Sequence, residues 1–137
     1  MFKWKEGFSV NVQNIDDQHK ELFRLGTELY TLVSSKDGID HYDEIMKVID
    51  SLAKYTVYHF EYEEGVMRDN NYIELEEHKK QHDAFVAKIN SIKSEDVDMR
   101  QRKIGMDLIV FIANWIEKHI LITDMKYKEY LNEMGVF

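Results

Sequence analysis

Cysteine and proline are both absent from this chain of 137 residues, and only six glycines occur in it. A protein without cysteine forms no disulfide, no iron–sulfur cluster and no thiolate metal site, so any metal held here must bind to histidine and carboxylate groups. A chain without proline and with few glycines favours long helices joined by short polar turns. These absences restrict both the fold and the chemistry.

Apolar runs and basic residues are scarce as well. No stretch of about 18 apolar residues occurs and no apolar block follows the N-terminus, so we expect neither a membrane span nor a signal peptide and predict a cytoplasmic protein. Lys and Arg number 18 against 26 Asp and Glu, which gives a net charge of -8. A nucleic acid partner would need a basic stripe and is not expected. The length and the hydrophobic share of 44% indicate one globular domain, residues 1–137.

Four segments repeat their apolar residues in alternating steps of three and four, the spacing of a helix that buries one face. Asp16 or Asp17 is expected to cap the first of them. The segments run from about Asp17 to Ser34, Tyr42 to Asp69, Ile73 to Ile92 and Met99 to Glu133. Four helices with short connections predict an all-α fold, an antiparallel up-down-up-down four-helix bundle. An extended N-terminal arm is expected to lay its apolar residues over this bundle: Trp4, Phe8, Val10, Val12 and Ile15.

Histidine is concentrated on the inward faces of the predicted helices. A single buried histidine is usually a core residue with a satisfied hydrogen bond, but two carboxylates, Glu63 and Asp124, share the same interior. Each buried polar group without a partner costs roughly 2 to 7 kcal/mol, so such a cluster requires a compensating charge, which metal ions supply. Only His41 falls in a predicted turn, and the inward histidines are His19, His59, His78, His82 and His119.

The spacing of these residues supports a shared site. His59 and Glu63, like His78 and His82, are four residues apart, which places each pair on one helical face about 40° apart. His119 and Asp124 are five residues apart, and a regular helix would separate them by about 140°. We therefore predict a π-turn or a helix break between Ile120 and Thr123, a feature that occurs preferentially at functional sites.

The number of donor atoms indicates the type of metal centre. Five imidazoles offer five bonds, two bridging carboxylates offer four, and one oxygen bridge derived from water adds two, whereas two octahedral ions require twelve. One coordination position is then open. Nitrogen-rich sites of this kind suit iron better than magnesium or calcium, which prefer oxygen.

The same residues resemble the pattern of the bacterial hemerythrins from the N-terminal arm to near the C-terminus. The matching elements are Trp4 with Ile15 to Lys20, His59-Phe60 with Glu63-Glu64 and Met67, His78-x-x-x-His82, and Trp115-x-x-x-His119 with Asp124 and Tyr127. The resemblance implies two iron ions (Fe2+/Fe3+) with an oxo or hydroxo bridge that bind dioxygen reversibly at the open position. It further implies that His78, His82 and His119 hold one iron, that His19 and His59 hold the other, and that Glu63 and Asp124 bridge both.

The surroundings of the open position must keep out water and additional protons. By helical spacing Phe23 and Trp115 are candidates for apolar walls of an oxygen pocket, with ordinary core packing as the competing interpretation. Further candidates are Ile120, Leu121 and Met67. Glu64 and Asp16 are candidate acceptors for a hydrogen bond from a metal-bound imidazole. Tyr127 is either a core residue or the donor of a hydrogen bond to a bridging carboxylate.

Three functions are compatible with a metal in this interior. Reversible oxygen binding, without enzymatic activity, is the prediction, and a di-iron oxidoreductase that consumes peroxide or nitric oxide is the alternative. Oxygen-activating bundles of the ferritin type use Glu-x-x-His pairs, which this sequence lacks. A metal-dependent phosphohydrolase of the HD type, read from His82-Asp83, leaves His19, His78 and His119 unexplained. The role in storage, delivery, scavenging or sensing and any protein partner stay open, and a monomer is expected.

Overall fold

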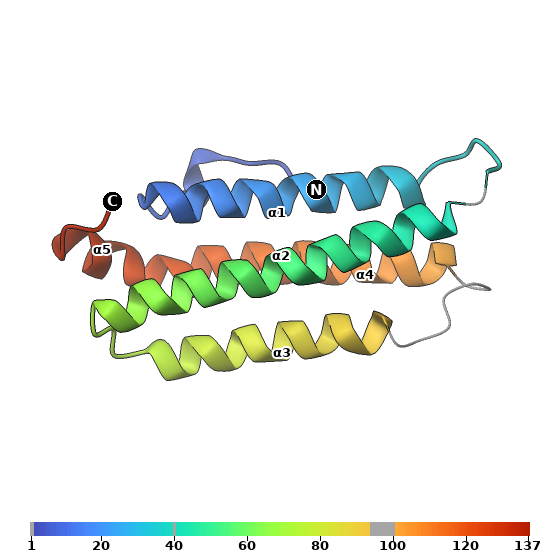
Figure 1. Cartoon of the computed structure of the whole chain (residues 1–137). Coiled ribbons are helices and arrows are strands. Elements are labelled where there is room, and N and C mark those ends of the chain that lie inside the picture. The colour runs from blue at the N-terminus through green and yellow to red at the C-terminus, as the bar shows by residue number, and fades with distance from the viewer. Residues whose placement is uncertain (1, 40, 94–100) are drawn as a thin grey trace.

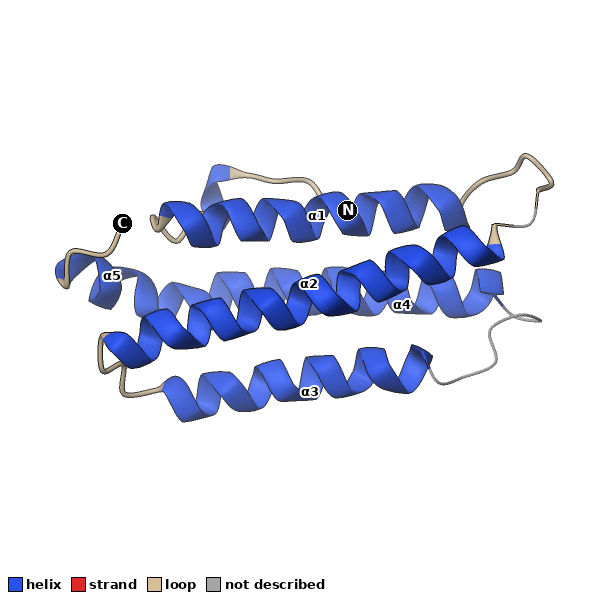
Figure 2. Ribbon diagram, viewed as in Figure 1, coloured by secondary structure: helices blue, strands red, loops and turns tan. Residues whose placement is uncertain are grey.

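The computed structural model describes residues 2–39, 41–93 and 101–137, apart from the side chains of residues 92, 93, 101–105 and 108. In Figure 1 four helical rods lie side by side and alternate in direction along the chain. Figure 2 shows only helices and loops in the described part of the chain. The prediction of an all-α, antiparallel four-helix bundle is therefore confirmed. The rods are α1 (Gln13–Val33), α2 (Tyr42–Asp69), α3 (Leu75–Lys93) and a composite of α4 (Gln101–Lys118), η2 (His119–Asp124) and α5 (Met125–Glu133).

The first helix begins earlier than its acidic residues predict. Val12 is the residue before α1, and no side chain caps the helix. Asp16 lies inside the first turn, where its carboxylate accepts hydrogen bonds from Ser9 Oγ at 2.6 Å and from the backbone N–H of Val10 at 2.9 Å. The prediction of Asp16 or Asp17 as the cap was wrong because Asp16 bonds to the N-terminal arm instead. Ile15 consequently belongs to α1.

The N-terminal arm crosses the outside of α1, as predicted, and contains one short 3-10 turn, η1 (Glu6–Phe8). Phe8 is buried and meets the ring of Phe23 edge-on, with the two centroids 5.3 Å apart. Phe2 packs so closely over Gly26 that a Cβ there would lie 2.5 Å from the Phe2 ring. The missing side chain of Gly26 thus gives the arm its place on the bundle.

The third helix, in contrast, begins later than predicted. Ile73 is 93% exposed and precedes α3, which starts at Leu75. The predicted turn at residues 94–98 and the side chains of Ile92 and Leu108 lie outside the described residues. None of the helices in the described ranges is both long enough and apolar enough to span a membrane.

Two apolar clusters fill the bundle and leave a polar layer between them. The larger cluster includes Leu22 and Phe60, and the smaller one includes Ile15, Met67 and Tyr127. On α1 the predicted ligand His19 lies between Ile15 of the smaller cluster and Leu22 of the larger one, and on α2 Glu63 lies between Met67 and Phe60. The fold therefore seals a polar layer between two dry cores.

Candidate metal centre

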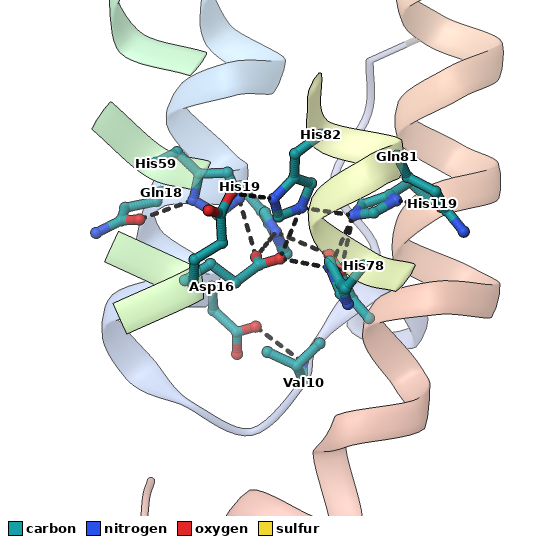
Figure 3. A network of polar contacts seen from close by, with 12 residues as sticks. Val10, Asp16, Gln18, His19, His59, His78, Gln81, His82 and His119 are labelled. Atoms are coloured by element: carbon teal, nitrogen blue, oxygen red, sulfur yellow. Dashed lines mark hydrogen bonds and ion pairs between the residues drawn. The ribbon is translucent and has the colours of Figure 1, made fainter. Parts of the chain in front are cut away.

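All four rods contribute to the polar layer, and the structure brings all seven predicted ligand side chains together in it. Figure 3 shows the five histidines of this group close to one another. None of the seven side chains belongs to a residue that is more than 4% exposed. They come from α1 (His19), α2 (His59 and Glu63), α3 (His78 and His82) and η2 (His119 and Asp124).

One carboxylate oxygen from each acidic residue faces a group of three histidines. Oε1 of Glu63 lies 2.8 Å from Nε2 of His78 and 3.2 Å from Nε2 of His82. Oδ1 of Asp124 lies 2.9 Å from Nε2 of His78 and 3.0 Å from Nε2 of His119. Five donor atoms thus converge on one point.

The second oxygen of each carboxylate faces the other two histidines. Oε2 of Glu63 lies 3.1 Å from Nε2 of His59 and 3.5 Å from Nε2 of His19, and Oδ2 of Asp124 lies 3.2 Å from Nε2 of His19. Each carboxylate therefore spans two neighbouring groups of nitrogen atoms. This arrangement would suit two metal ions that share both carboxylates, with three histidines on one side and two on the other.

The π-turn predicted from the spacing of His119 and Asp124 is present. The last rod changes from α-helix to a π-helical segment, η2, that runs from His119 to Asp124 and returns to α-helix at Met125. Because π-helical hydrogen bonds join residues five apart, the wider turn carries Asp124 round to the face that His119 occupies. A regular helix would have directed one of the two side chains away from the centre.

Three imidazoles are oriented by hydrogen bonds on their outer nitrogen. Nδ1 of His59 donates to Oε1 of Gln18 at 2.7 Å, and Nδ1 of His82 donates to Oε2 of Glu64 at 2.8 Å. Nδ1 of His119 donates to Oε1 of Gln81 at 2.9 Å. With the proton fixed on Nδ1, the lone pair on Nε2 points into the cluster, as metal binding requires.

These contacts confirm one predicted acceptor and correct the other. Glu64 accepts a hydrogen bond from a cluster histidine as predicted, whereas Asp16 is occupied by Ser9 and Val10. Gln18 and Gln81 were not predicted. Their only signal in the sequence is that each directly precedes a candidate ligand, His19 and His82, yet each bonds to a histidine of a neighbouring rod.

The cluster fits metal ions because protein groups alone do not satisfy it. Nε2 of His82 and Nε2 of His119 lie 3.1 Å apart. Both imidazoles hold their proton on Nδ1, so two bare lone pairs face each other and cannot form a hydrogen bond. Oε2 of Glu63 and both oxygens of Asp124 are buried without a hydrogen-bond partner among the described residues. A pair of cations at the two converging points would satisfy all of these atoms.

Without metal, protons provide part of this charge. Burial alone would lower the pKa of His19, but the negative carboxylates of Asp124 and Glu63 beside its Nε2 outweigh it and raise the pKa to about 9. The same opposition raises the pKa of His78 to about 9. Burial would raise the pKa of Glu63, yet the neighbouring histidines hold it well below its ordinary value, and the pKa of Asp124 is lowered as well. The carboxylates are thus ionised and available for cations at neutral pH.

Aromatic rings cover the three-histidine side. Phe60 stacks on His82 with ring centroids 3.8 Å apart, and Trp115 stacks on His119 at 4.3 Å. Tyr127 lies over His78 at 5.6 Å. Tyr127 is fully buried and its hydroxyl has no hydrogen-bond partner among the described residues, which favours the core interpretation over a bond to a carboxylate. Phe60 directly follows His59 on α2, and nothing in the sequence indicated that its ring would stack on His82 of α3.

The predicted oxygen-pocket residues fall in different places. Phe23 packs with Phe8 and Trp4 under the arm, Trp115 covers His119, and Ile120 is buried at 2% exposure in the larger core. Leu121 is 48% exposed and faces away from the interior, so its prediction as a wall was wrong. Met67 is buried in the smaller core, and the roles of Phe23, Trp115, Ile120 and Met67 stay predictions.

The structure does not support the interpretation as a phosphohydrolase of the HD type, because the side chain of Asp83 lies away from the cluster. The side chain of Asp83 is 65% exposed and forms a salt bridge with Lys79 at 2.9 Å. It therefore lies outside the cluster that contains His82, and the His-Asp pair of such enzymes is not formed.

Comparison with known proteins agrees with this geometry. The sequence profile of the hemerythrin HHE cation binding domain matches residues 10–131, which includes all seven clustered residues. The chain belongs to the hemerythrin family. Membership implies a non-haem di-iron centre, and the cluster of histidines and carboxylates suits one.

Individual hemerythrins match over nearly the whole chain. A bacteriohemerythrin of Clostridium acetobutylicum is 35% identical over 127 residues, which are 93% of this chain and 98% of the relative. Myohemerythrin-1 of Phascolopsis gouldii is 30% identical over 93% of this chain and 92% of its own length. A crystal structure of wild-type hemerythrin superposes with a TM-score of 0.81 at 28% identity and covers 94% of this chain and 96% of its own.

Proposed function

We propose that this chain, residues 1–137, is a single domain that binds dioxygen reversibly at a di-iron centre. The observation that carries the proposal is the division of each carboxylate between two groups of histidines, with one oxygen of Glu63 and one of Asp124 on each side. The proposed ligands are His19, His59, Glu63, His78, His82, His119 and Asp124.

The two sides of the centre offer different numbers of donors. The three-histidine side supplies three nitrogens and two oxygens, whereas the side with His19 and His59 supplies two nitrogens and two oxygens. We therefore place the open coordination position beside His19 and His59. An iron pair held by this cluster, with an oxo or hydroxo bridge, would supply two electrons as both ions pass from Fe2+ to Fe3+, and would offer a position for dioxygen.

The protein's own residues hold and protect that position. Hydrogen bonds that the imidazoles donate to Gln18, Glu64 and Gln81 fix the rings, which reduces the freedom of the ligands to rearrange. His19 and His59 are each 1% exposed, so bulk water does not reach the proposed open side directly. Phe23, Trp115 and Ile120 remain the proposed apolar surroundings of bound oxygen.

Carriage rather than catalysis is part of the same proposal. Five neutral imidazoles and two carboxylates favour the reduced iron pair more than a carboxylate-rich site does, and reduced iron is the form that takes up oxygen. Dioxygen is the proposed partner, and a monomer in the cytoplasm stays a prediction.

One experiment tests this function. The protein is purified without oxygen, iron is counted per chain, and the visible spectrum is recorded while air is admitted and then removed. We expect two irons per chain and a coloured form that appears with oxygen and bleaches when oxygen is withdrawn. Colour that never reverses would contradict reversible carriage, and steady consumption of peroxide or nitric oxide would favour the oxidoreductase alternative.

A further inference from the structure

Gln81 connects two residues of the π-helical segment to α3. Its amide oxygen accepts a hydrogen bond from Nδ1 of His119 at 2.9 Å and a second from Oγ1 of Thr123, also at 2.9 Å. Figure 3 shows Gln81 beside His119 at the edge of the cluster. Since Thr123 directly precedes Asp124, one side chain of α3 is tied to both ends of the segment that carries two proposed ligands.

The hydrogen bond of Thr123 differs from those of the other threonines in this chain. Thr27, Thr31 and Thr56 each donate to the backbone carbonyl four residues earlier, at 2.9, 2.9 and 2.7 Å, which is the usual local bond of a helical threonine. Thr123 instead donates across the bundle to Gln81. The hydroxyl therefore holds the acceptor of His119 rather than its own helix.

Among the three hydrogen bonds on the outer nitrogens of the imidazoles, that of His119 to Gln81 is the closest to solvent. The bonds of His59 to Gln18 and of His82 to Glu64 are buried, whereas the bond of His119 to Gln81 is only partly buried. A surface depression of about 250 Å³ lies beside it, with a lining of Gln81, Trp115, Lys118, His119, Ile122 and Thr123. Water in this depression would compete for the Nδ1 hydrogen of His119 if Gln81 were free to turn.

We propose that Gln81 and Thr123 form a clamp that positions the imidazole of His119 and limits its electron donation to the metal. Both lone pairs of the Gln81 oxygen are used, so the oxygen cannot swing away from His119. A neutral amide is a weaker hydrogen-bond acceptor than a carboxylate. Gln81 therefore makes the imidazole of His119 a weaker electron donor than Glu64 makes the imidazole of His82. The clamp rests on the proposed di-iron function, and both residues are positioning residues that act through His119.

The test uses the full chain and compares four variants with matched controls. Gln81→Leu removes the acceptor, Thr123→Val removes the second donor, Thr123→Ser keeps it, and Gln81→Glu keeps an acceptor but adds charge. Gln13→Leu and Thr31→Val make the same chemical changes at exposed positions of α1. The readouts are iron(II) affinity by competition with a chelator and the midpoint potential of the loaded protein.

The clamp predicts a roughly 10- to 100-fold loss of iron affinity in Gln81→Leu, the range typical for groups that orient a metal ligand. Thr123→Val should lose less, Thr123→Ser should behave as the parent does, and Gln81→Glu should restore affinity while lowering the midpoint potential. The two controls should match the parent protein in both measurements.

Parent-like affinity and potential in Gln81→Leu would overturn the clamp, and so would a loss of thermal stability with neither quantity changed. If Gln81→Leu does not fold, Thr123→Val and Gln81→Glu decide the question by the same two readouts. A parent protein that takes up no iron contradicts the proposed function instead, and the affinity comparison is then made with cobalt(II) or zinc(II), so the two failures are distinguishable.

Discussion

The carboxylate of Glu64 accepts a hydrogen bond from Nδ1 of His82 at 2.8 Å, whereas the corresponding acceptors of His59 and His119 are the neutral amides of Gln18 and Gln81. A carboxylate makes the imidazole a stronger electron donor than an amide does, and a stronger donor stabilises oxidised iron. The three-histidine side therefore contains one histidine with a distinct electronic role.

Replacing Glu64 by Gln should keep His82 oriented but weaken its electron donation. We expect a higher midpoint potential and an iron affinity lower by up to about 10-fold, measured by redox titration and chelator competition. Glu61→Gln is the matched control, since Glu61 lines the same 420 Å³ surface depression as Glu64 but bonds to no cluster histidine in the described structure. An unchanged potential in Glu64→Gln, or an equal shift in Glu61→Gln, would remove the distinction.

Iron should stabilise the fold strongly because, without metal, the lone pairs of His82 and His119 oppose each other and buried carboxylate oxygens of Glu63 and Asp124 lack hydrogen-bond donors in the described part of the chain. A ligand that binds only the folded state at 100 times its Kd adds about 2.7 kcal/mol to the free energy of unfolding. We expect the melting temperature, followed by circular dichroism without oxygen, to rise by several degrees with iron(II) and to fall again with a chelator. Magnesium, which prefers oxygen ligands, should have little effect. A melting temperature that does not respond to iron would contradict a shared metal site.

The sequence predicted the helices better than their first residues. Periodicity located α2 with both of its ends, because its apolar face continues over the whole length. The start of α1 was missed, since Asp16 has the side chain of a capping residue but meets the arm through Ser9 and Val10. That choice depends on a contact across seven residues, and local propensity contains no information about it.

In the site, too, features within one helix were predictable from the sequence, whereas contacts between helices were not. Ligand spacing within one helix predicted the π-segment from His119 to Asp124, because five residues fit one face only when the turn is widened. The hydrogen bonds of Gln18 and Gln81 run between rods, and their partners follow from which rods are neighbours. From the sequence alone, the hydrogen-bond partner of a glutamine next to a histidine cannot be predicted, because it depends on how the helices pack.

Histidines inside and outside the cluster provide a direct test of the ligand assignment. His82→Ala should lower the iron count per chain and change the visible spectrum, because Nε2 of His82 lies 3.2 Å from Oε1 of Glu63 within the cluster. His41→Ala should leave both unchanged, since the imidazole of His41 pairs with Asp37 at 3.0 Å and Glu44 at 3.1 Å, outside the cluster. A spectral change in His41→Ala, or none in His82→Ala, would mean that the assignment is wrong.

Iron binding should release protons, because two of the proposed ligands hold them in the metal-free protein. The pKa values of His19 and His78 are raised to about 9, so both imidazoles are protonated at pH 7, whereas a metal binds only the neutral form. Iron affinity should therefore rise with pH up to about 9 and fall as the solution becomes more acidic. Anaerobic calorimetric titrations at pH 7, in two buffers of different ionisation enthalpy, should show at least two protons released per chain, two from the imidazoles and any further ones from the water that forms the bridge. The pKa of His41 is raised as well, but His41 lies outside the cluster, so His41→Ala should release the same number. Equal heats in the two buffers would show that the cluster binds iron without displacing protons, and His19 and His78 would then be neutral before the metal arrives.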